Sequence, residues 1–255
     1  MTLAPPAFGL LIIGDEILSG KRQDRHFQQV REILARRGLM LSQVTLLGDD
    51  RARLTGFLRD SFAAGDILFS CGGIGSTPDD HTRQAAAAAL GVPLVLHPEA
   101  AELIAGRSRQ AGQPVTPERL QMGEFPEGAS IIPNPVNQIP GFSIRQHHFV
   151  PGFPDMAWPM IEWLLDNRYA AHFHGHRQAE RGMIVRGLGE ATLTPLMMAV
   201  EHDHPGLKVF SLPILNREQP DDYRIELGVK GDPDHIDAGF EQLRAGTAAL
   251  GGRIE

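Results

Sequence analysis

The chain has 255 residues, of which 42% are hydrophobic, enough to bury the core of one large domain or two smaller ones. Its formal net charge of −7 and its lack of a basic patch exclude nucleic acid as the main partner. The single cysteine excludes an intrachain disulfide, and no stretch reaches the length of a membrane span or reads as a signal peptide. We therefore expect a cytoplasmic protein with no membrane partner.

The first half of the chain alternates apolar strands with amphipathic helices. Three apolar runs with the length of strands occupy residues 8–13, 39–47 and 66–71. Stretches with helical spacing follow them at residues 25–37, 54–62 and 79–90. A serial β-α-β-α-β-α order predicts a mostly parallel sheet covered by helices on both faces, a three-layer α/β/α fold.

The middle of the chain is less regular. Further helices are expected at residues 99–110, 117–123 and 155–165. Residues 134–142 read as a turn-rich loop, and residues 147–150 as a short strand. The run Pro151-Gly152-Phe153-Pro154 after that strand predicts a rigid wall near a ligand rather than a reactive element, since two of its residues lack an N–H group.

A polar segment divides the sequence into two predicted domains. We expect the first domain at residues 1–168, a linker at 169–177 and a small α+β domain at 178–255. Within the second domain, strands are predicted at 181–186, 207–212 and 223–229, and helices at 191–201 and 233–250. The alternating His172, His174 and His176 of the segment could face one metal, but a solvated linker is favoured because structural zinc sites carry differently spaced ligand pairs.

The most informative motif is the glycine-rich turn that follows the third predicted strand. Residues 72–82 read Gly-Gly-Ile-Gly-Ser-Thr-Pro-Asp-Asp-His-Thr. Glycines let the backbone approach a ligand closely, and the free N–H groups at the start of the next helix attract an anion. The adjacent aspartates would repel a bare phosphate, so the turn predicts a phosphate or nucleotide site assisted by a divalent metal. The candidate substrate-binding residues are Gly14, Gly72, Gly73, Gly75, Ser76, Thr77 and Thr82.

Acidic loops follow three successive predicted strands. They are Gly14-Asp15-Glu16, Gly48-Asp49-Asp50 and Pro78-Asp79-Asp80. Because the carboxyl ends of parallel strands meet at one edge of a sheet, these loops are expected to converge there. We expect Asp49 and Asp80 to be catalytic. The candidate ligands of Mg²⁺, Mn²⁺ or Co²⁺ are Asp15, Glu16, Asp49, Asp79 and Asp80.

Two nearby acids and the cysteine have structural alternatives. Asp50 suits the cap of the following helix better than the site, because Asp is a favourable N-cap residue. Asp79 is equally suited to the metal and to the N-terminus of the next helix. Cys71 is interpreted as a small buried strand residue rather than a reactive thiol.

Four stretches together resemble the MoaB/Mog family of molybdopterin-binding domains, and within it the N-terminal part of CinA proteins. They are residues 14–20 with Asp24, residues 48–54, residues 72–82 and residues 137–156, in the order of the family. Residues 178–255 resemble the small KH-like domain that follows in CinA proteins. His26 departs from the usual Asn of the family, and Phe153 and Asp155 depart from the Pro and Ser that are frequent in CinA proteins.

The resemblance implies a three-layer fold that binds a pterin or nucleotide at the strand ends and assembles into a homo-oligomer. In the Mog branch the positions of Asp49 and Asp80 are linked to molybdopterin adenylylation. In the CinA branch the domain is linked to metal-dependent pyrophosphatase activity on ADP-ribose, which is the activity we expect here. A non-catalytic protein that binds a pterin such as molybdopterin, or a nucleotide, and an adenylyl transferase are the alternatives. The sequence ends at Glu255 before the deamidase domain of full-length CinA, so deamidation is not expected.

Overall fold

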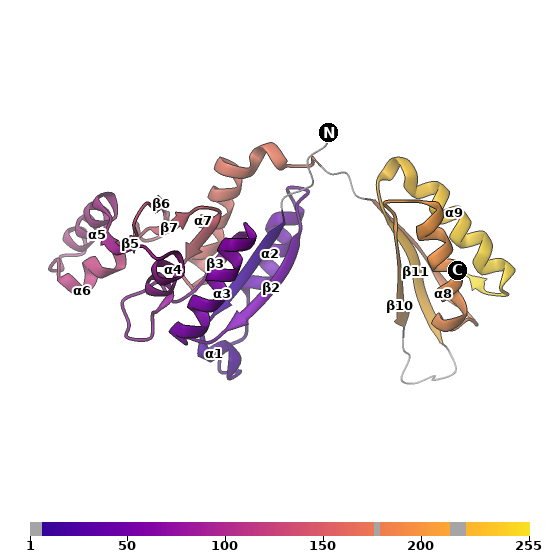
Figure 1. Ribbon diagram of the computed structural model, residues 1–255, viewed down its shortest axis with the longest axis horizontal. Coiled ribbons are helices and arrows are strands. Elements are labelled where there is room, and N and C mark those ends of the chain that lie inside the picture. The colour runs from indigo at the N-terminus through magenta and orange to yellow at the C-terminus, as the bar shows by residue number, and fades with distance from the viewer. Residues whose placement is uncertain (1–6, 176–178, 215–222) are drawn as a thin grey trace. The chain divides into compact units, whose positions relative to one another are not determined.

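The computed structural model describes residues 7–175, 179–214 and 223–255, and the chain forms two compact units, residues 1–175 and 176–255 (Figure 1). The first unit is built on a six-stranded sheet with strand order β2-β1-β3-β8-β7-β6. The parallel strands are β1 (Phe8–Ile13), β2 (Leu41–Leu47), β3 (Ile67–Cys71) and β8 (His147–Val150). The antiparallel strands are β7 (Gly141–Ile144) and β6 (Ser130–Ile132). The predicted mostly parallel sheet is confirmed.

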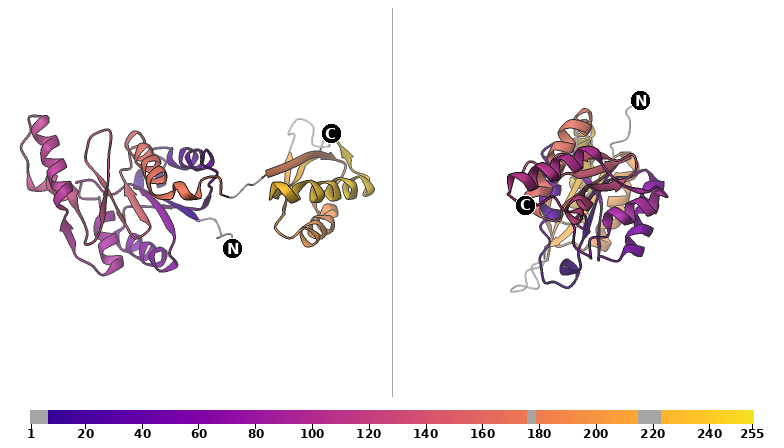
Figure 2. Two further views of the ribbon diagram at one scale, coloured as in Figure 1. Left: turned by 90° about the horizontal axis from the view of Figure 1, so that it is seen from above. Right: turned by 90° about the vertical axis from the view of Figure 1, so that its left-hand side faces the viewer.

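Helices cover both faces of this sheet (Figures 1 and 2). Helices α2 (His26–Ala35) and α7 (Pro154–Leu164) pack against the face that carries Phe8, Leu10 and Ile12 of β1. Helices α3 (Arg51–Ala64) and α4 (Thr82–Leu90) pack against the opposite face, which carries Leu11 and Ile13. Successive residues of a strand point to opposite faces, so a strand buried on both faces needs the unbroken apolar run seen at residues 8–13.

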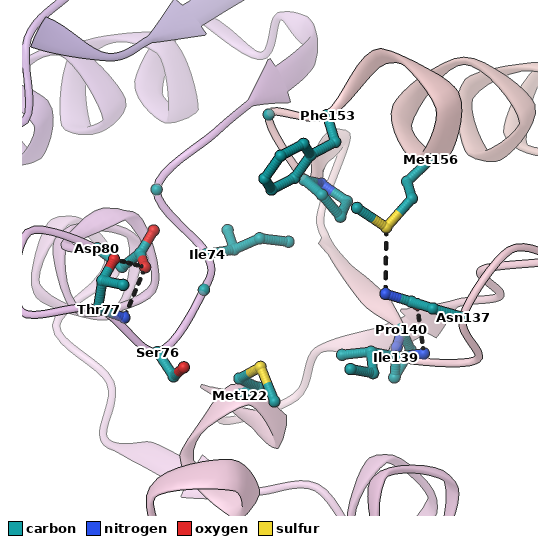
Figure 3. A pocket seen from close by; sticks show the side chains of 14 residues that line it. Ile74, Ser76, Thr77, Asp80, Met122, Asn137, Ile139, Pro140, Phe153 and Met156 are labelled. Carbon is teal, nitrogen blue, oxygen red and sulfur yellow. Dashed lines mark hydrogen bonds between the residues drawn. The ribbon is translucent and has the colours of Figure 1, made fainter. Parts of the chain in front are cut away.

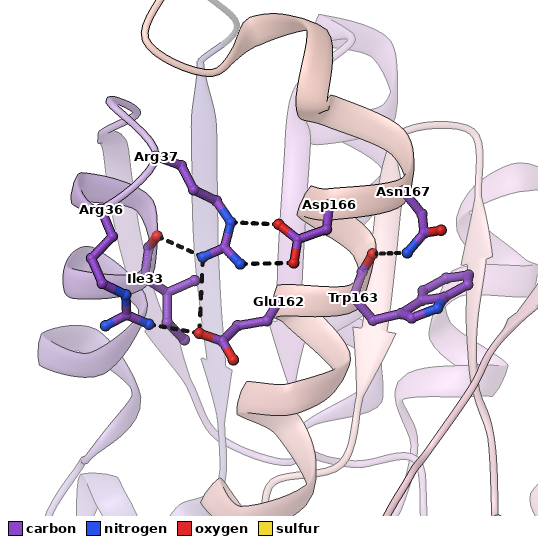
Figure 4. A network of polar contacts seen from close by, with 7 residues as sticks. All are labelled: Ile33, Arg36, Arg37, Glu162, Trp163, Asp166 and Asn167. Carbon is purple, nitrogen blue, oxygen red and sulfur yellow. Dashed lines mark hydrogen bonds and ion pairs between the residues drawn. The ribbon is translucent and has the colours of Figure 1, made fainter.

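Ion pairs join Arg36 and Arg37, which directly follow α2, to α7 and to the turn that continues it (Figure 4). Arg37 donates from Nε and Nη2 to the two carboxylate oxygens of Asp166, at 2.7 and 3.0 Å. Arg36 donates to Glu162 at 2.6 Å. Bidentate guanidinium–carboxylate pairs are stronger and more directional than single contacts, so Arg37 is the main polar link between the end of α2 and the end of α7.

The predicted linker from residue 169 is wrong in its first part. A π-helical turn (Leu165–Tyr169) and a 3₁₀ turn (Ala170–His172) continue α7, and Tyr169 is buried in the core. The backbone N–H of His174 donates to the carbonyl of Arg37 at 2.9 Å. The polar composition of this segment concealed Tyr169 and Phe173, which pack against the core. His172 and His174 are exposed, whereas His176 lies outside the described residues.

Between α4 and β6 the chain forms two helices, a 3₁₀ turn and two strands that pair with each other rather than with the main sheet. They are β4 (Leu94–Leu96), α5 (Pro98–Gln110), α6 (Pro117–Leu120), a 3₁₀ turn (Gln121–Gly123) and β5 (Glu124–Pro126). The strands β4, β5 and β6 were not predicted, because three residues are too few to show an alternating pattern. Strand β7 begins at Gly141, inside the residues that were interpreted as a loop.

The second unit is a separate α+β domain, as predicted. Its antiparallel sheet has the order β10-β11-β9-β12, from β9 (Ala179–Arg186), β10 (Lys208–Ile214), β11 (Arg224–Gly231) and β12 (Arg253–Ile254). Helices α8 (Glu190–Asp203) and α9 (Pro233–Ala249) share one apolar core with the sheet. The likeness to a KH domain stays a prediction. Within the described residues, no helix has the length and apolar character needed to cross a membrane.

Candidate functional site

A pocket of about 380 Å³ lies at the carboxyl ends of β3 and β8 (Figure 3). These strands are parallel neighbours, so the loops that follow them lie side by side at one edge of the sheet. The pocket is lined by Gly73, Ile74, Gly75, Ser76, Thr77, Asp80, Met122, Asn137, Ile139, Pro140, Pro151, Gly152, Phe153 and Met156. The part of the predicted glycine-rich turn from Gly73 to Thr77 therefore forms one of its walls, whereas the predicted Gly72 does not line the pocket.

The glycines of this turn are required by close contacts. Gly72 and Gly73 have positive φ angles of 114° and 68°, which favour glycine. A Cβ atom on Gly73 would lie 2.1 Å from Oγ1 of Thr82, and one on Gly72 would lie 2.5 Å from the carbonyl oxygen of Ile13. The prediction that Thr82 contacts a ligand needs correction. Its side chain is buried, does not line the pocket, and donates to the carbonyl of Gly72 at 3.1 Å.

Asp80 lies in the pocket wall with one carboxylate oxygen fixed by the preceding turn. Its Oδ2 accepts a hydrogen bond from the backbone N–H of Thr77 at 2.8 Å and another from the hydroxyl of Thr77. This turn is why α4 begins at Thr82 rather than at the predicted residue 79. Gly75 leaves space for the carboxylate, because a Cβ there would lie 2.6 Å from Oδ2. Among the described residues, Oδ1 of Asp80 accepts no hydrogen bond.

The acidic loops after β1 and β2 hold each other through reciprocal hydrogen bonds. The N–H of Asp15 donates to Oδ2 of Asp49 at 2.9 Å, and the N–H of Asp49 donates to Oδ1 of Asp15 at 3.2 Å. Gly48 permits this pairing, because a Cβ there would lie 2.3 Å from the same Oδ1. The predicted helix cap is confirmed, since Asp50 accepts from the N–H of Arg53 at 2.8 Å.

Negative charge accumulates around Asp49. Partial burial raises the pKa of Asp49, and the charges of Asp15, Asp79 and Glu16 raise this pKa further. None of these four acids lines the pocket, and Asp79 is exposed. Gly14 likewise lies outside the pocket lining, where its carbonyl accepts from the N–H of Ile17 at 3.1 Å. In the described part of the chain, no three His, Cys, Asp or Glu side chains form a ready metal site.

The wall opposite the glycine turn is apolar (Figure 3). Phe153 is 60% exposed despite its size, and Met156 lies beside it, whereas Met122 lines the pocket nearer Ser76. Asn137 donates from Nδ2 to the sulfur of Met156 at 3.1 Å and accepts from the N–H of Ile139 at 2.9 Å. Of the predicted wall Pro151-Gly152-Phe153-Pro154, the first three residues line the pocket and Pro154 does not, and their contact with a ligand stays a prediction. An apolar ring and flexible thioethers suit the face of a planar heterocycle.

Residues 9–171 match the family described as a probable molybdopterin binding domain. The chain belongs to this family. A CinA-like protein of Anaeromyxobacter is 39% identical over 161 residues, which cover 61% of this chain and 39% of that protein. A Pyrobaculum calidifontis protein is 30% identical over 217 residues, covering 82% of this chain and 81% of its own length. The predicted membership in the MoaB/Mog-like, CinA-like group is confirmed.

The fold of this molybdopterin-binding domain matches a solved relative. The crystal structure of the protein CinA from Thermoplasma acidophilum, whose function is stated to be unknown, aligns with a TM-score of 0.57 and 24% identity. The alignment covers 63% of this chain and 98% of that one. The likeness supports the three-layer architecture. The chain spans 39% of the length of the Anaeromyxobacter CinA-like protein, so the activity of that whole protein is not carried over.

Two buried residues of the molybdopterin-binding domain shape the pocket and were not predicted as part of it. Arg83 donates from Nη2 to the carbonyl of Gly75 at 2.7 Å and from Nη1 to the carbonyl of Gln121. Burial lowers the pKa of Arg83. Nε2 of His26 lies 3.0 Å from the carbonyl oxygen of Gly152, and burial lowers its pKa. No local sequence pattern predicts these contacts, because each of them joins residues from different helices, strands or loops.

The other buried ionisable groups of this domain are structural. His147 is hydrogen-bonded to Ser61 at 2.9 Å, and His148 to Tyr169 at 2.7 Å. Burial lowers the pKa of His147 to about 4 and that of His148 to about 3, so both rings are neutral in the core. The interpretation of Cys71 as a buried strand residue is confirmed, and its burial raises the pKa of its thiol.

Proposed function

We propose that this domain binds a nucleotide in the pocket beside the glycine turn and hydrolyses the phosphoanhydride bond of ADP-ribose or of a similar dinucleotide. One observation carries the proposal: a single pocket has exposed backbone and Asp80 on one wall and an apolar wall with Phe153 on the other. The first wall suits a phosphate group, and the second suits a base or a pterin ring. A dinucleotide supplies both parts in one molecule.

In this proposal, some residues of the turn bind the phosphate groups and others take part in the hydrolysis. The backbone from Gly73 to Ser76 and the exposed hydroxyl of Ser76 donate to phosphate oxygens. Thr77 orients Asp80 through two hydrogen bonds to Oδ2. Oδ1 is then free to bind a cation or to accept the proton of an attacking water. Arg83 holds the carbonyl of Gly75 away from the phosphate, where a carbonyl oxygen would be repulsive.

Asp15 and Asp49, in the loops that follow β1 and β2, would be the carboxylates to hold a magnesium ion together with substrate. Asp15 and Asp49 each commit one oxygen to the backbone N–H of the other, which leaves one oxygen each among the described contacts. Mg²⁺ is typically held by one or two carboxylates with waters and substrate phosphates, so a complete protein cage is not needed. When bound, the ion neutralises the diphosphate and lowers the pKa of a water molecule.

A non-catalytic pterin- or nucleotide-binding protein is the second candidate. The observation that favours it is the lack of a ready group of three metal ligands in the described residues. Such a protein would bind molybdopterin or a nucleotide in the same pocket without turnover. It would depend little on divalent metal, because the apolar wall and the backbone donors would supply the affinity.

A turnover screen of the full chain separates these candidates. The purified protein is incubated with ADP-ribose, FAD, NAD or ATP in the presence of Mg²⁺, Mn²⁺ or Co²⁺, and the products are identified by mass spectrometry. We expect metal-dependent release of a nucleoside monophosphate, which Asp80→Asn abolishes. The matched control is Asp60→Asn, an exposed carboxylate of α3 outside the pocket. Saturable binding without product would favour the second candidate, and strict dependence on ATP with a pterin would indicate adenylyl transfer.

A further inference from the structure

A second cavity, of about 410 Å³, adjoins the pocket beside the glycine turn. Both cavities are lined by Ser76, Met122, Asn137 and Ile139. A ligand that occupies the first pocket can therefore extend past Ser76 and Met122 into the second cavity. The new walls come from α5, α6 and the segment between them, which were outside the predicted site.

The charge of the second cavity is opposite to that of the first. Arg107 of α5 and Arg119 of α6 line it, and its described lining includes no Asp or Glu. Nη1 of Arg119 donates to Oγ of the buried Ser108 at 3.3 Å. Neither arginine forms an ion pair within the described ranges. Two guanidinium groups without a neutralising carboxylate therefore border one concave space.

A purely structural role explains only part of this arrangement. Arg107 and Arg109 both lie in the last turn of α5, where positive charge stabilises the end of a helix. Arg109 serves that role from an exposed position outside the cavity, whereas Arg107 lines the cavity. Arg119 is half-buried and links α6 to α5 through Ser108. The hydrogen bond to Ser108 uses one of the five N–H groups of the Arg119 guanidinium and leaves the other four for a ligand.

We propose that the second cavity is an oxyanion subsite that binds a phosphate monoester of the ligand held at the glycine turn. The proposal rests on the proposed function in that the first pocket holds the nucleotide. Guanidinium groups match phosphate in geometry and hydrogen-bonding, and a phosphate monoester carries nearly two negative charges against the two positive charges here. The substrate class is then a dinucleotide that carries a further phosphate besides its diphosphate.

Binding of matched nucleotide pairs to the full chain tests the subsite. Isothermal titration compares NADP⁺ with NAD⁺, and coenzyme A with dephospho-coenzyme A, since the members of each pair differ by one phosphate monoester. We expect the phosphorylated member of at least one pair to bind about tenfold more tightly. Arg107→Gln/Arg119→Gln removes this preference, and Arg107→Lys/Arg119→Lys retains part of it. Arg109→Gln is the matched control and leaves the preference unchanged.

Two results would overturn the subsite. One is a double variant that melts like the wild-type protein and keeps the full preference for the phosphorylated ligand. The other is a wild-type protein that shows no such preference in either nucleotide pair. If the double variant melts early, Arg107→Gln alone decides, because its exposed side chain has no described ion pair. ADP-ribose turnover is measured in parallel. Turnover without any preference refutes the subsite alone, whereas an arginine-dependent preference without turnover refutes the proposed hydrolysis alone.

Discussion

The close packing of the glycine turn predicts that Gly73→Ala lowers the stability of the protein more than a comparable glycine substitution elsewhere. The added Cβ would lie 2.1 Å from Oγ1 of Thr82, and the φ angle of Gly73 is +68°. Gly91, at the end of the following helix, has the same φ of +68° but no atom within 4 Å of its added Cβ. Gly91→Ala therefore introduces the backbone strain alone, and Gly73→Ala introduces the strain together with the displacement of Thr82.

The two costs can be estimated separately. An alanine in the left-handed region costs about 1–2 kcal/mol, which applies to both variants. Displacing the buried hydroxyl of Thr82 from the carbonyl of Gly72 costs about 1–3 kcal/mol more. We expect the free energy of unfolding to fall by about 1–2 kcal/mol in Gly91→Ala and by about 2–5 kcal/mol in Gly73→Ala.

Urea denaturation followed by circular dichroism measures both values, and nucleotide binding measures the effect on the pocket. Gly73→Ala should also weaken binding, because the turn that lines the pocket must move, whereas Gly91→Ala should leave binding unchanged. The double variant Gly73→Ala/Thr82→Ala should lose less stability than the sum of its single variants. Equal destabilisation by Gly73→Ala and Gly91→Ala would refute the packing of Thr82 against the turn.

Three further predictions concern the core, the helix layer and the acidic loops. Between pH 6.5 and about 4, both histidines bind protons in the unfolded chain, whereas His147 and His148 stay neutral in the folded core. The free energy of unfolding should therefore decrease as the pH is lowered, by about 2 kcal/mol per histidine at pH 5. Equal urea midpoints at pH 7.5 and pH 5 would contradict this. Arg37→Met should cost about 1–2 kcal/mol of stability by removing the bidentate pair to Asp166, and Arg36→Met, at a more exposed position, less than about 1 kcal/mol. Similar melting temperatures for the two variants would count against this prediction. Mg²⁺ at a hundredfold excess over its Kd should stabilise the wild-type protein by about 2.7 kcal/mol, and the Asp49→Asn variant by much less. Differential scanning calorimetry measures both values. Equal stabilisation of the two proteins would mean that Asp49 does not bind the ion.

Local patterns were sufficient for the architecture of the first unit. The unbroken apolar run from Phe8 to Ile13 identified a strand that is buried on both faces. The serial order of strands and helices then implied the parallel sheet, and the glycines after β3 marked the turn that lines the pocket. Asp50 could be assigned to the helix cap because capping is a local interaction.

Contacts between distant elements could not be predicted in this way. Arg83 reads as an ordinary helix residue, although it joins the glycine turn to the 3₁₀ turn that carries Met122. Arg107 and Arg119 line the same cavity because α6 packs against α5, a contact that the local sequence does not reveal. Tyr169 was hidden in a polar segment, because a single buried aromatic side chain produces no periodic pattern.

The most direct test of the proposed hydrolysis uses ADP-ribose and Mg²⁺ in oxygen-labelled water. Mass spectrometry follows AMP and ribose 5-phosphate, with the wild-type protein and Asp80→Asn compared at equal concentration. Attack of water on the phosphoanhydride predicts one labelled oxygen in one of the two phosphate products and no product from Asp80→Asn. Unlabelled products, or equal rates for the wild-type protein and Asp80→Asn, would contradict the assignment of hydrolysis to this pocket.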